Sequence, residues 1–130
     1  MNLLRIVRAR GMPISRPLPQ ILSRDGDLLQ QTFRLNIDPE LIWFRGHFPG
    51  RPVLAGIVQL HWAVLLAAAC FSIEQVPLEI KRLKFKSVVV PPDVLDLSLK
   101  RVTEAEVAFA YAGAAGKCSE GRLVFPGAAA

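Results

Sequence analysis

The chain has 130 residues, of which 52% are hydrophobic and 21% are charged, which predicts one folded domain and excludes an intrinsically disordered chain. A formal net charge of +5 favours a polyanionic partner, either a nucleic acid, an anionic lipid or an acidic carrier protein. Neither a helix-turn-helix pattern nor an aromatic-interleaved RNA-binding motif is present, so we expect no nucleic-acid partner. The basic residues are scattered, and solvated strand faces and loops are an equally good interpretation of the charge.

Residues 1–19 are interpreted as an N-terminal extension and residues 126–130 as a flexible tail. Met1–Arg10 alternates apolar and basic residues and lacks the continuous apolar core of a secretory signal. The apolar run Trp62–Phe71 is too short to span a membrane. We therefore expect a cytoplasmic protein without a membrane span.

The two cysteines, Cys70 and Cys118, show no metal-type spacing. Cys70 falls in an apolar segment and is predicted to be a small core residue. Cys118 falls in a predicted turn, where it could be exposed. A disulfide between them has no support in the sequence, which agrees with a reducing compartment.

A β-hairpin is expected near the N-terminus. Its first strand is predicted over Gln20–Ser23, and Arg24–Asp27 is the turn, where Asp25-Gly26 supplies the positive φ angles of a tight turn. The return strand is predicted over Leu28–Ile37, and its alternation places five residues on one face: Leu29, Gln31, Phe33, Leu35 and Ile37. Asp38 begins a short turn or one-turn helix.

The central element is a helix predicted over Gly56–Phe71. It follows a loop, Gly46–Gly56, whose glycines and prolines restrict the backbone. The helix is apolar on almost every side after its first turn, with Gln59 and His61 as the polar exceptions. This pattern predicts burial on most of its faces.

Strands are predicted to follow the helix, at Leu78–Val90, Val94–Val102, Glu106–Ala112 and Lys117–Phe125. The breaks between them contain Pro91-Pro92-Asp93, Thr103-Glu104 and Gly113–Gly116. One long helix, with a hairpin before it and a strand meander after it, predicts an α+β fold in which an antiparallel sheet closes over the helix.

Both histidines of the chain, His47 and His61, lie in this central region, 14 residues apart. A neutral imidazole is suited to act as a general base, so His47, held in a rigid loop, is a candidate base. Gly56 at the helix start permits a close approach, and its N–H could polarise a carbonyl oxygen. A base beside a polarised carbonyl predicts proton abstraction α to that carbonyl.

Each histidine also has a structural interpretation. His47 could cap backbone groups of its loop, and His61 could be a core histidine with a hydrogen-bond partner. A zinc site that uses both histidines has no visible third ligand, because Cys70 lies about two and a half helical turns beyond His61. We therefore expect no metal.

The stretch Gly46–Leu60, GHFPGRPVLAGIVQL, resembles the signature of the 3-hydroxyacyl-[acyl-carrier-protein] dehydratases of fatty-acid synthesis. Lys84–Asp93 resembles a later segment of the same family, and the resemblance covers residues 28–102. The step from Gln59 to Ala63 is most similar to the branch that acts in aryl polyene pathways. The resemblance implies a hot-dog fold over residues 1–130, with a long helix wrapped by a curved antiparallel sheet. It also implies a dimer whose helices lie side by side.

The resemblance also implies a reaction and its residues. The family eliminates water from a 3-hydroxyacyl thioester to give a trans-2-enoyl thioester, without a metal or organic cofactor. His47 matches the catalytic histidine, and Gly56 matches the glycine whose N–H polarises the thioester carbonyl. The implied substrate-binding residues are Phe48, Pro49, Gly56, Gln59 and Trp62, beside an apolar tunnel for the acyl chain.

The chain departs from the family pattern at two positions. Ala55 replaces the proline before the helix glycine, and His61 occupies the position of the catalytic carboxylate. That carboxylate helps the 3-hydroxyl group to leave, or holds the water that does. Burial in an apolar helix lowers the pKa of a histidine. His61 could therefore be a substituted acid, a contact for an altered substrate, or the mark of a protein that no longer dehydrates.

Three functions remain open from the sequence. The first is a dehydratase or dehydratase-like enzyme with His47 and His61 as catalytic residues. The second is a weak or inactive homologue that binds acyl chains or pairs with an active subunit, and the third is an acyl thioesterase of the same fold. The expected partners are an acyl carrier protein thioester and a second hot-dog subunit, identical or different. The candidate carrier-docking surface consists of Arg45, Arg51, Lys81, Arg82 and Lys84.

Overall fold

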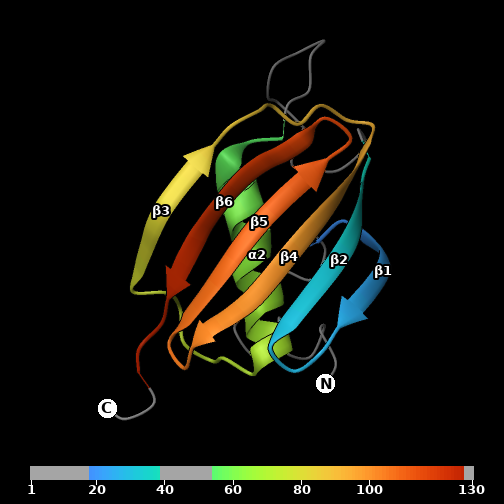
Figure 1. The fold of residues 1–130 in the computed structure, drawn as a ribbon. Helices are drawn as coiled ribbons and strands as arrows, with labels where there is room; N and C mark the ends of the chain where they lie inside the picture. The colour runs from blue at the N-terminus through green and yellow to red at the C-terminus, as the bar shows by residue number, and fades with distance from the viewer. Residues whose placement is uncertain (1–17, 39–53, 128–130) are drawn as a thin grey trace.

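The computed structural model describes residues 18–38 and 54–127. Six strands form one antiparallel sheet in the order β1-β2-β4-β5-β6-β3 (Figure 1). The strands are β1 (Gln20–Gly26), β2 (Gln30–Ile37), β3 (Glu79–Phe85), β4 (Asp93–Thr103), β5 (Glu106–Gly113) and β6 (Gly116–Val124). The predicted α+β architecture is confirmed.

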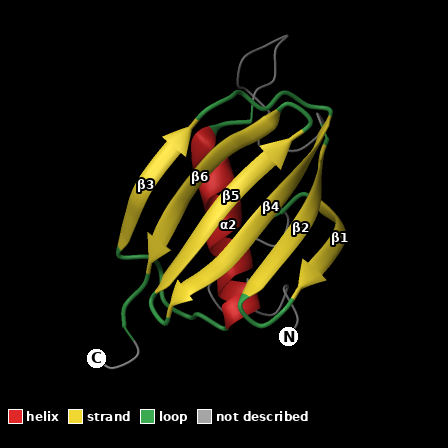
Figure 2. Ribbon diagram, viewed as in Figure 1, coloured by secondary structure: helices red, strands yellow, loops and turns green. Residues whose placement is uncertain are grey.

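The helix α2 (Gly56–Phe71) lies across one face of the sheet, as Figure 2 shows. Its bounds are those that the sequence predicts. The core between helix and sheet is built from alternate strand residues, such as Phe33, Leu97 and Leu123, each fully buried. Apolar side chains on alternate strand positions and along one side of the helix leave water together, and this burial holds the two layers in contact.

The first hairpin differs from its prediction in the position of the turn. Strand β1 continues to Gly26, and the connection consists of Asp27, Leu28 and Leu29. The carboxylate of Asp27 accepts hydrogen bonds from the backbone N–H groups of Leu29 and Gln30, each 2.9 Å long. This local side-chain capping favours the later turn over the Asp25-Gly26 turn that the sequence suggests. The face of β2 is as predicted for Phe33, Leu35 and Ile37, whereas Leu29 lies in the exposed connection.

The strand after the helix is shorter than predicted. β3 ends at Phe85, where the N–H groups of Lys86 and Ser87 both donate to the Cys118 carbonyl. The chain then leaves the sheet, and the Val89 carbonyl accepts a hydrogen bond of 2.8 Å from the Leu54 N–H. The segment after β3 therefore supports the residues just before α2 instead of extending the sheet.

The last three strands agree with the prediction within one or two residues, including the alternation that buries Leu95, Leu97 and Leu99. Cys118 is a correction, because it is buried within β6 and not exposed in a turn. Cys70 is partly buried on α2, and both thiols are free. Within the described ranges, no helix is long and apolar enough to cross a membrane.

Candidate functional site at the start of the central helix

The helix α2 begins without a side-chain cap. Its N-cap residue, Ala55, has no side-chain group that accepts a hydrogen bond. The Ala55 carbonyl accepts from the N–H groups of Val58 and Gln59 at 3.1 and 3.2 Å. The N–H groups of Gly56 and Ile57 precede these and have no acceptor inside the helix. The positive end of the helix dipole acts at the same place, so the start of α2 suits a partly negative oxygen.

Gly56 lies under an aromatic ring. A Cβ atom built on Gly56 would lie 2.6 Å from both Cε1 and Cζ of Phe85. Real Cβ atoms do not approach other atoms this closely, so only glycine fits while the ring keeps its position. Phe85, at the end of β3, belongs to no predicted site, although it lies in a segment that resembles the dehydratase family.

Gln59 holds the first turn of α2 against the sheet. Its side chain is only 3% exposed. The Ser119 hydroxyl donates a 2.7 Å hydrogen bond to Gln59 Oε1, and Gln59 Nε2 donates to the Leu54 carbonyl at 3.3 Å. The Tyr111 hydroxyl donates to the Gln59 carbonyl at 2.6 Å. The structure thus gives the Gln59 amide protein partners in the core, whereas the sequence predicts a substrate contact.

His61 lies on the other side of the helix. His61 is two positions after Gln59, and each position turns the helix by about 100°. His61 therefore lies about 200° around the helix axis from Gln59 and faces away from the sheet. The side chain is half-buried, and burial lowers its pKa from the ordinary value of 6.5. The imidazole is therefore mainly neutral at neutral pH. It lies about 7.5 Å along the axis from Gly56, which is within the span of one small substrate.

Trp62 is fully buried in the core. Its indole Nε1 has no hydrogen-bond partner in the described part of the chain. Its place in the substrate-binding set stays a prediction. Ser119 and Tyr111, which anchor Gln59, were not predicted from sequence, since each is an ordinary member of an alternating strand.

Other predicted site residues lie outside the described ranges. These are the candidate base His47 with Phe48 and Pro49, and the predicted docking residues Arg45 and Arg51. Their roles stay predictions. Among described residues, no cluster of three or more His, Cys, Asp or Glu side chains could hold a metal ion.

The remaining docking residues belong to β3. Lys81 forms an ion pair of 3.7 Å with Glu106, which also pairs with Arg122 at 2.7 Å. Arg82 and Lys84 line a groove of about 430 Å³ that also includes Lys100, Ser98 and Ala110. Ser98 and Lys100 alternate with the buried leucines of β4, so this groove lies on the sheet face opposite α2.

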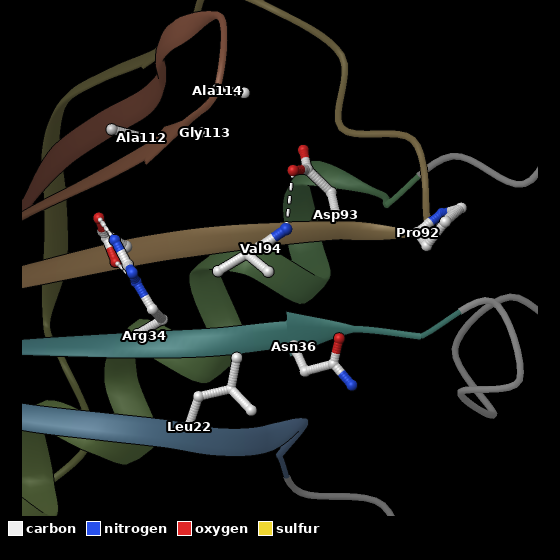
Figure 3. Close-up of a pocket in the computed structure, with 10 residues that line it drawn as sticks. Leu22, Arg34, Asn36, Pro92, Asp93, Val94, Ala112, Gly113 and Ala114 are labelled. Atoms are coloured by element: carbon white, nitrogen blue, oxygen red, sulfur yellow. Dashed lines mark hydrogen bonds and ion pairs between the residues drawn. The ribbon is translucent and has the colours of Figure 1, made fainter.

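A larger cavity of about 700 Å³ is also formed by residues of that opposite face (Figure 3). Its polar lining includes the Arg34–Asp96 ion pair, 3.0 Å long, and Asp93, whose carboxylate accepts from the Val94 N–H. None of the residues predicted to be catalytic or substrate-binding lines it. This cavity is larger than the groove beside Arg82 and Lys84, but the start of α2 has the chemistry for binding a carbonyl oxygen.

Comparisons with known proteins agree with the geometry. The profile of the ApeI-like family, described as ApeI dehydratase, matches residues 23–122. The chain is 35% identical over 86 residues to a 3-hydroxyacyl-[acyl-carrier-protein] dehydratase FabZ from Levilactobacillus brevis, across 61% of this chain and 57% of the relative. It therefore spans little more than half the length of that curated relative.

Two solved structures share the fold. One is the dehydratase heterocomplex ApeI:P from Xenorhabdus doucetiae, with 27% identity, a TM-score of 0.75, and coverage of 82% of this chain and 96% of that chain. The other is an uncharacterized protein from Erwinia carotovora subsp. atroseptica, with 29% identity, a TM-score of 0.74, and coverage of 87% and 99%. The predicted hot-dog fold is confirmed by these similarities.

Proposed function

We propose, from the premise that the chain belongs to the ApeI-like dehydratase family, that it eliminates water from a 3-hydroxyacyl thioester. The observation that carries the proposal is the start of α2 at Gly56. No side chain caps this helix end, and Gly56 itself has no room for a side chain. An acyl carrier protein is the proposed carrier of the thioester. The pathway is one of fatty-acid or aryl polyene type.

In the proposed reaction, the thioester carbonyl oxygen binds at the Gly56 N–H. His47 removes a proton from C2, and the electron pair moves toward the carbonyl, whose oxygen gains negative charge. The helix start stabilises that charge. The electrons then return to form the C2–C3 double bond, and the C3–O bond breaks. The leaving hydroxyl takes up the proton that His47 removed from C2, so that water leaves and His47 is neutral again.

His61 is proposed to assist the departure of the hydroxyl. Because burial lowers the pKa of His61, its neutral form predominates at neutral pH. A neutral imidazole donates one N–H and accepts at its other nitrogen, so it could hold the hydroxyl or a bridging water. It is a weaker proton donor than a carboxylic acid, so we expect slower turnover than a carboxylate at this position would support.

The decisive assay uses the purified protein with a 3-hydroxyacyl carrier-protein thioester, and follows conversion to the enoyl thioester. We expect turnover by the wild type and a loss of about 10²–10⁴-fold in His47→Ala, the usual contribution of a general base. His61→Asp and His61→Glu place a carboxylate at the acid position, and we expect each to turn over faster than the wild type. If neither the wild type nor a carboxylate variant turns over, the dehydratase proposal is wrong.

A second candidate function follows from His61 itself. A histidine with a lowered pKa in place of a carboxylate suits a subunit that binds acyl chains while a partner subunit carries out the chemistry. ApeI:P, one of the similar structures, is described as a heterocomplex. In the same assay, a silent wild type whose turnover is restored by His61→Asp would favour this candidate.

The same assay includes a thiol reagent, because release of free carrier thiol would indicate a thioesterase. That activity usually needs a carboxylate base on this helix, and α2 contains no Asp or Glu. For carrier docking, the described residues favour Arg82 and Lys84, which share the basic groove with Lys100. Lys81 is the weaker member of the predicted surface, since it already pairs with Glu106.

A further inference from the structure

An edge strand of the sheet, β3, carries a β-bulge that changes which way its side chains face. The register with β6 shifts between Lys81 and Lys84, and Arg82 has a φ angle of 52°. Leu83 lies three positions after Ile80, and residues an odd number of positions apart point to opposite faces of a regular strand. The bulge adds a residue and returns Leu83 to the face that Ile80 occupies.

The face that the bulge selects is the one toward α2. A Cβ atom on Gly121, a buried residue of β6, would lie 3.3 Å from Cδ1 of Leu83 and 2.8 Å from Cε2 of Phe109. Phe109 belongs to the core, so Leu83 faces the core as well. Phe85, two residues after Leu83, shares this face, and its ring reaches the start of α2.

The ring of Phe85 is positioned by the sheet that also holds the helix. Phe85 pairs with Ser119 in the β3–β6 register. Ser119 donates to Gln59, one turn after Gly56 on α2. The ring and the Gly56 amide are thus fixed through the same point of β6. Even so, Phe85 is 51% exposed, so half of a large apolar side chain is open beside the helix start.

We propose that Phe85 is a specificity-determining residue, whose ring forms the wall against which the acyl segment of a thioester bound at Gly56 packs. The inference rests on the proposed function, because it takes Gly56 as the carbonyl-binding position. An apolar ring in this place accepts an alkyl chain and limits the bulk next to the reacting carbons. Changes in the volume of such a pocket alter selection between substrates by roughly 10–200-fold.

The test compares Phe85→Ala with Ile80→Ala, a matched change on the same strand and the same face. Each protein is tested with 3-hydroxybutanoyl and 3-hydroxydecanoyl thioesters, and the ratio of kcat/KM values is determined. Binding of saturated butanoyl and decanoyl pantetheine thioesters is measured by calorimetry, and thermal unfolding checks the fold. We expect the Phe85 variant to shift the ratio by about tenfold or more toward the longer chain, and Ile80→Ala to leave it unchanged.

The outcomes separate this inference from the function on which it rests. If the wild type binds or converts thioesters but folded Phe85→Ala keeps the same chain preference, the inference is wrong and the function stands. An equal shift in Ile80→Ala would also overturn it, because the effect would belong to the strand. If the wild type neither binds nor converts any thioester, the proposed function fails, and this inference fails with it.

Discussion

At the scale of single residues, His61 is where the chain departs most from its family resemblance. It is half-buried on α2, and burial lowers its pKa from 6.5. The folded protein therefore binds the His61 proton more weakly than the unfolded chain does. Over the pH range between the lowered value and 6.5, the unfolded chain carries more proton, so stability rises with pH there.

The contribution of His61 to stability is fully present above pH 6.5 and is lost as the pH falls toward the lowered pKa. We expect thermal melting to show a larger loss between about pH 8 and about pH 5 for the wild type than for His61→Gln. Hydrogen bonds to Arg122 and Lys117 lower the pKa values of Glu106 and Glu120. The stability that these two carboxylates contribute is also lost in acid, but equally in both proteins. Parallel melting curves for the two proteins would contradict the prediction.

At the scale of elements, Gln59 makes the buried polar contact between the first turn of α2 and the sheet. Gln59 is bonded from two strands, by Tyr111 of β5 and Ser119 of β6. A buried hydroxyl or amide without a hydrogen-bond partner costs free energy, so these hydrogen bonds specify the position of α2 along the sheet. This register matters for function because Gly56, one turn earlier, must meet the ring of Phe85.

We expect Gln59→Leu to lower the free energy of unfolding by about 1–3 kcal/mol, because the Ser119 hydroxyl and the Leu54 carbonyl lose their buried partner. Urea titration of the single and double variants provides the measurement. Adding Ser119→Ala should cost less in the Gln59→Leu background than in the wild type, since the orphaned hydroxyl is removed. The control is Ser98→Ala on the opposite face, and equal effects at the two serines would refute the arrangement.

At the scale of the whole molecule, the side of α2 away from the sheet leaves apolar surface uncovered. Ile57 is 72% exposed at the start of the helix, and Leu60 and Val64 are only partly buried. Ile57, Leu60 and Val64 recur every three to four residues on α2, and a contiguous apolar patch of this kind is typical of a protein–protein contact surface. A second hot-dog subunit with its helix alongside α2, as the resemblance implies, would cover it.

We expect Ile57→Glu to weaken subunit association, because a charge would be buried in an apolar contact. Sedimentation velocity over a range of protein concentrations measures the change. The matched control is Val76→Glu, at a residue that is 65% exposed but lies beyond the helix. An unchanged dimer in Ile57→Glu would place the subunit contact elsewhere. A wild type that is monomeric alone would point to a different subunit as the partner.

The sequence by itself determined the elements. The bounds of α2 follow from an apolar run that begins after a Gly/Pro-rich loop, and the alternation of β2 and β4 follows from hydrophobic periodicity. Each segment expresses its pattern locally. The candidate site residue Gly56 was identified in the same way, from a loop that ends where an apolar run begins. The position of the first turn was wrong because the capping carboxylate of Asp27 competes with the Asp25-Gly26 pair, and composition does not rank the two.

Only the tertiary structure decided which groups meet. Gln59 reads as a polar exception in an apolar helix, and nothing local reveals that its partner is Ser119, 60 residues later. Cys118 was expected in a turn where it could be exposed, although the last predicted strand also includes it, and it is buried in β6. Phe85 looks like an ordinary strand residue in the sequence. In the structure, the bulge at Arg82 turns its side chain toward Gly56. Apolar runs and alternation are properties of neighbouring residues, so the helix and strands were predictable. Hydrogen-bond partners and ring contacts depend on segments far apart in the chain, so the surroundings of the helix were not.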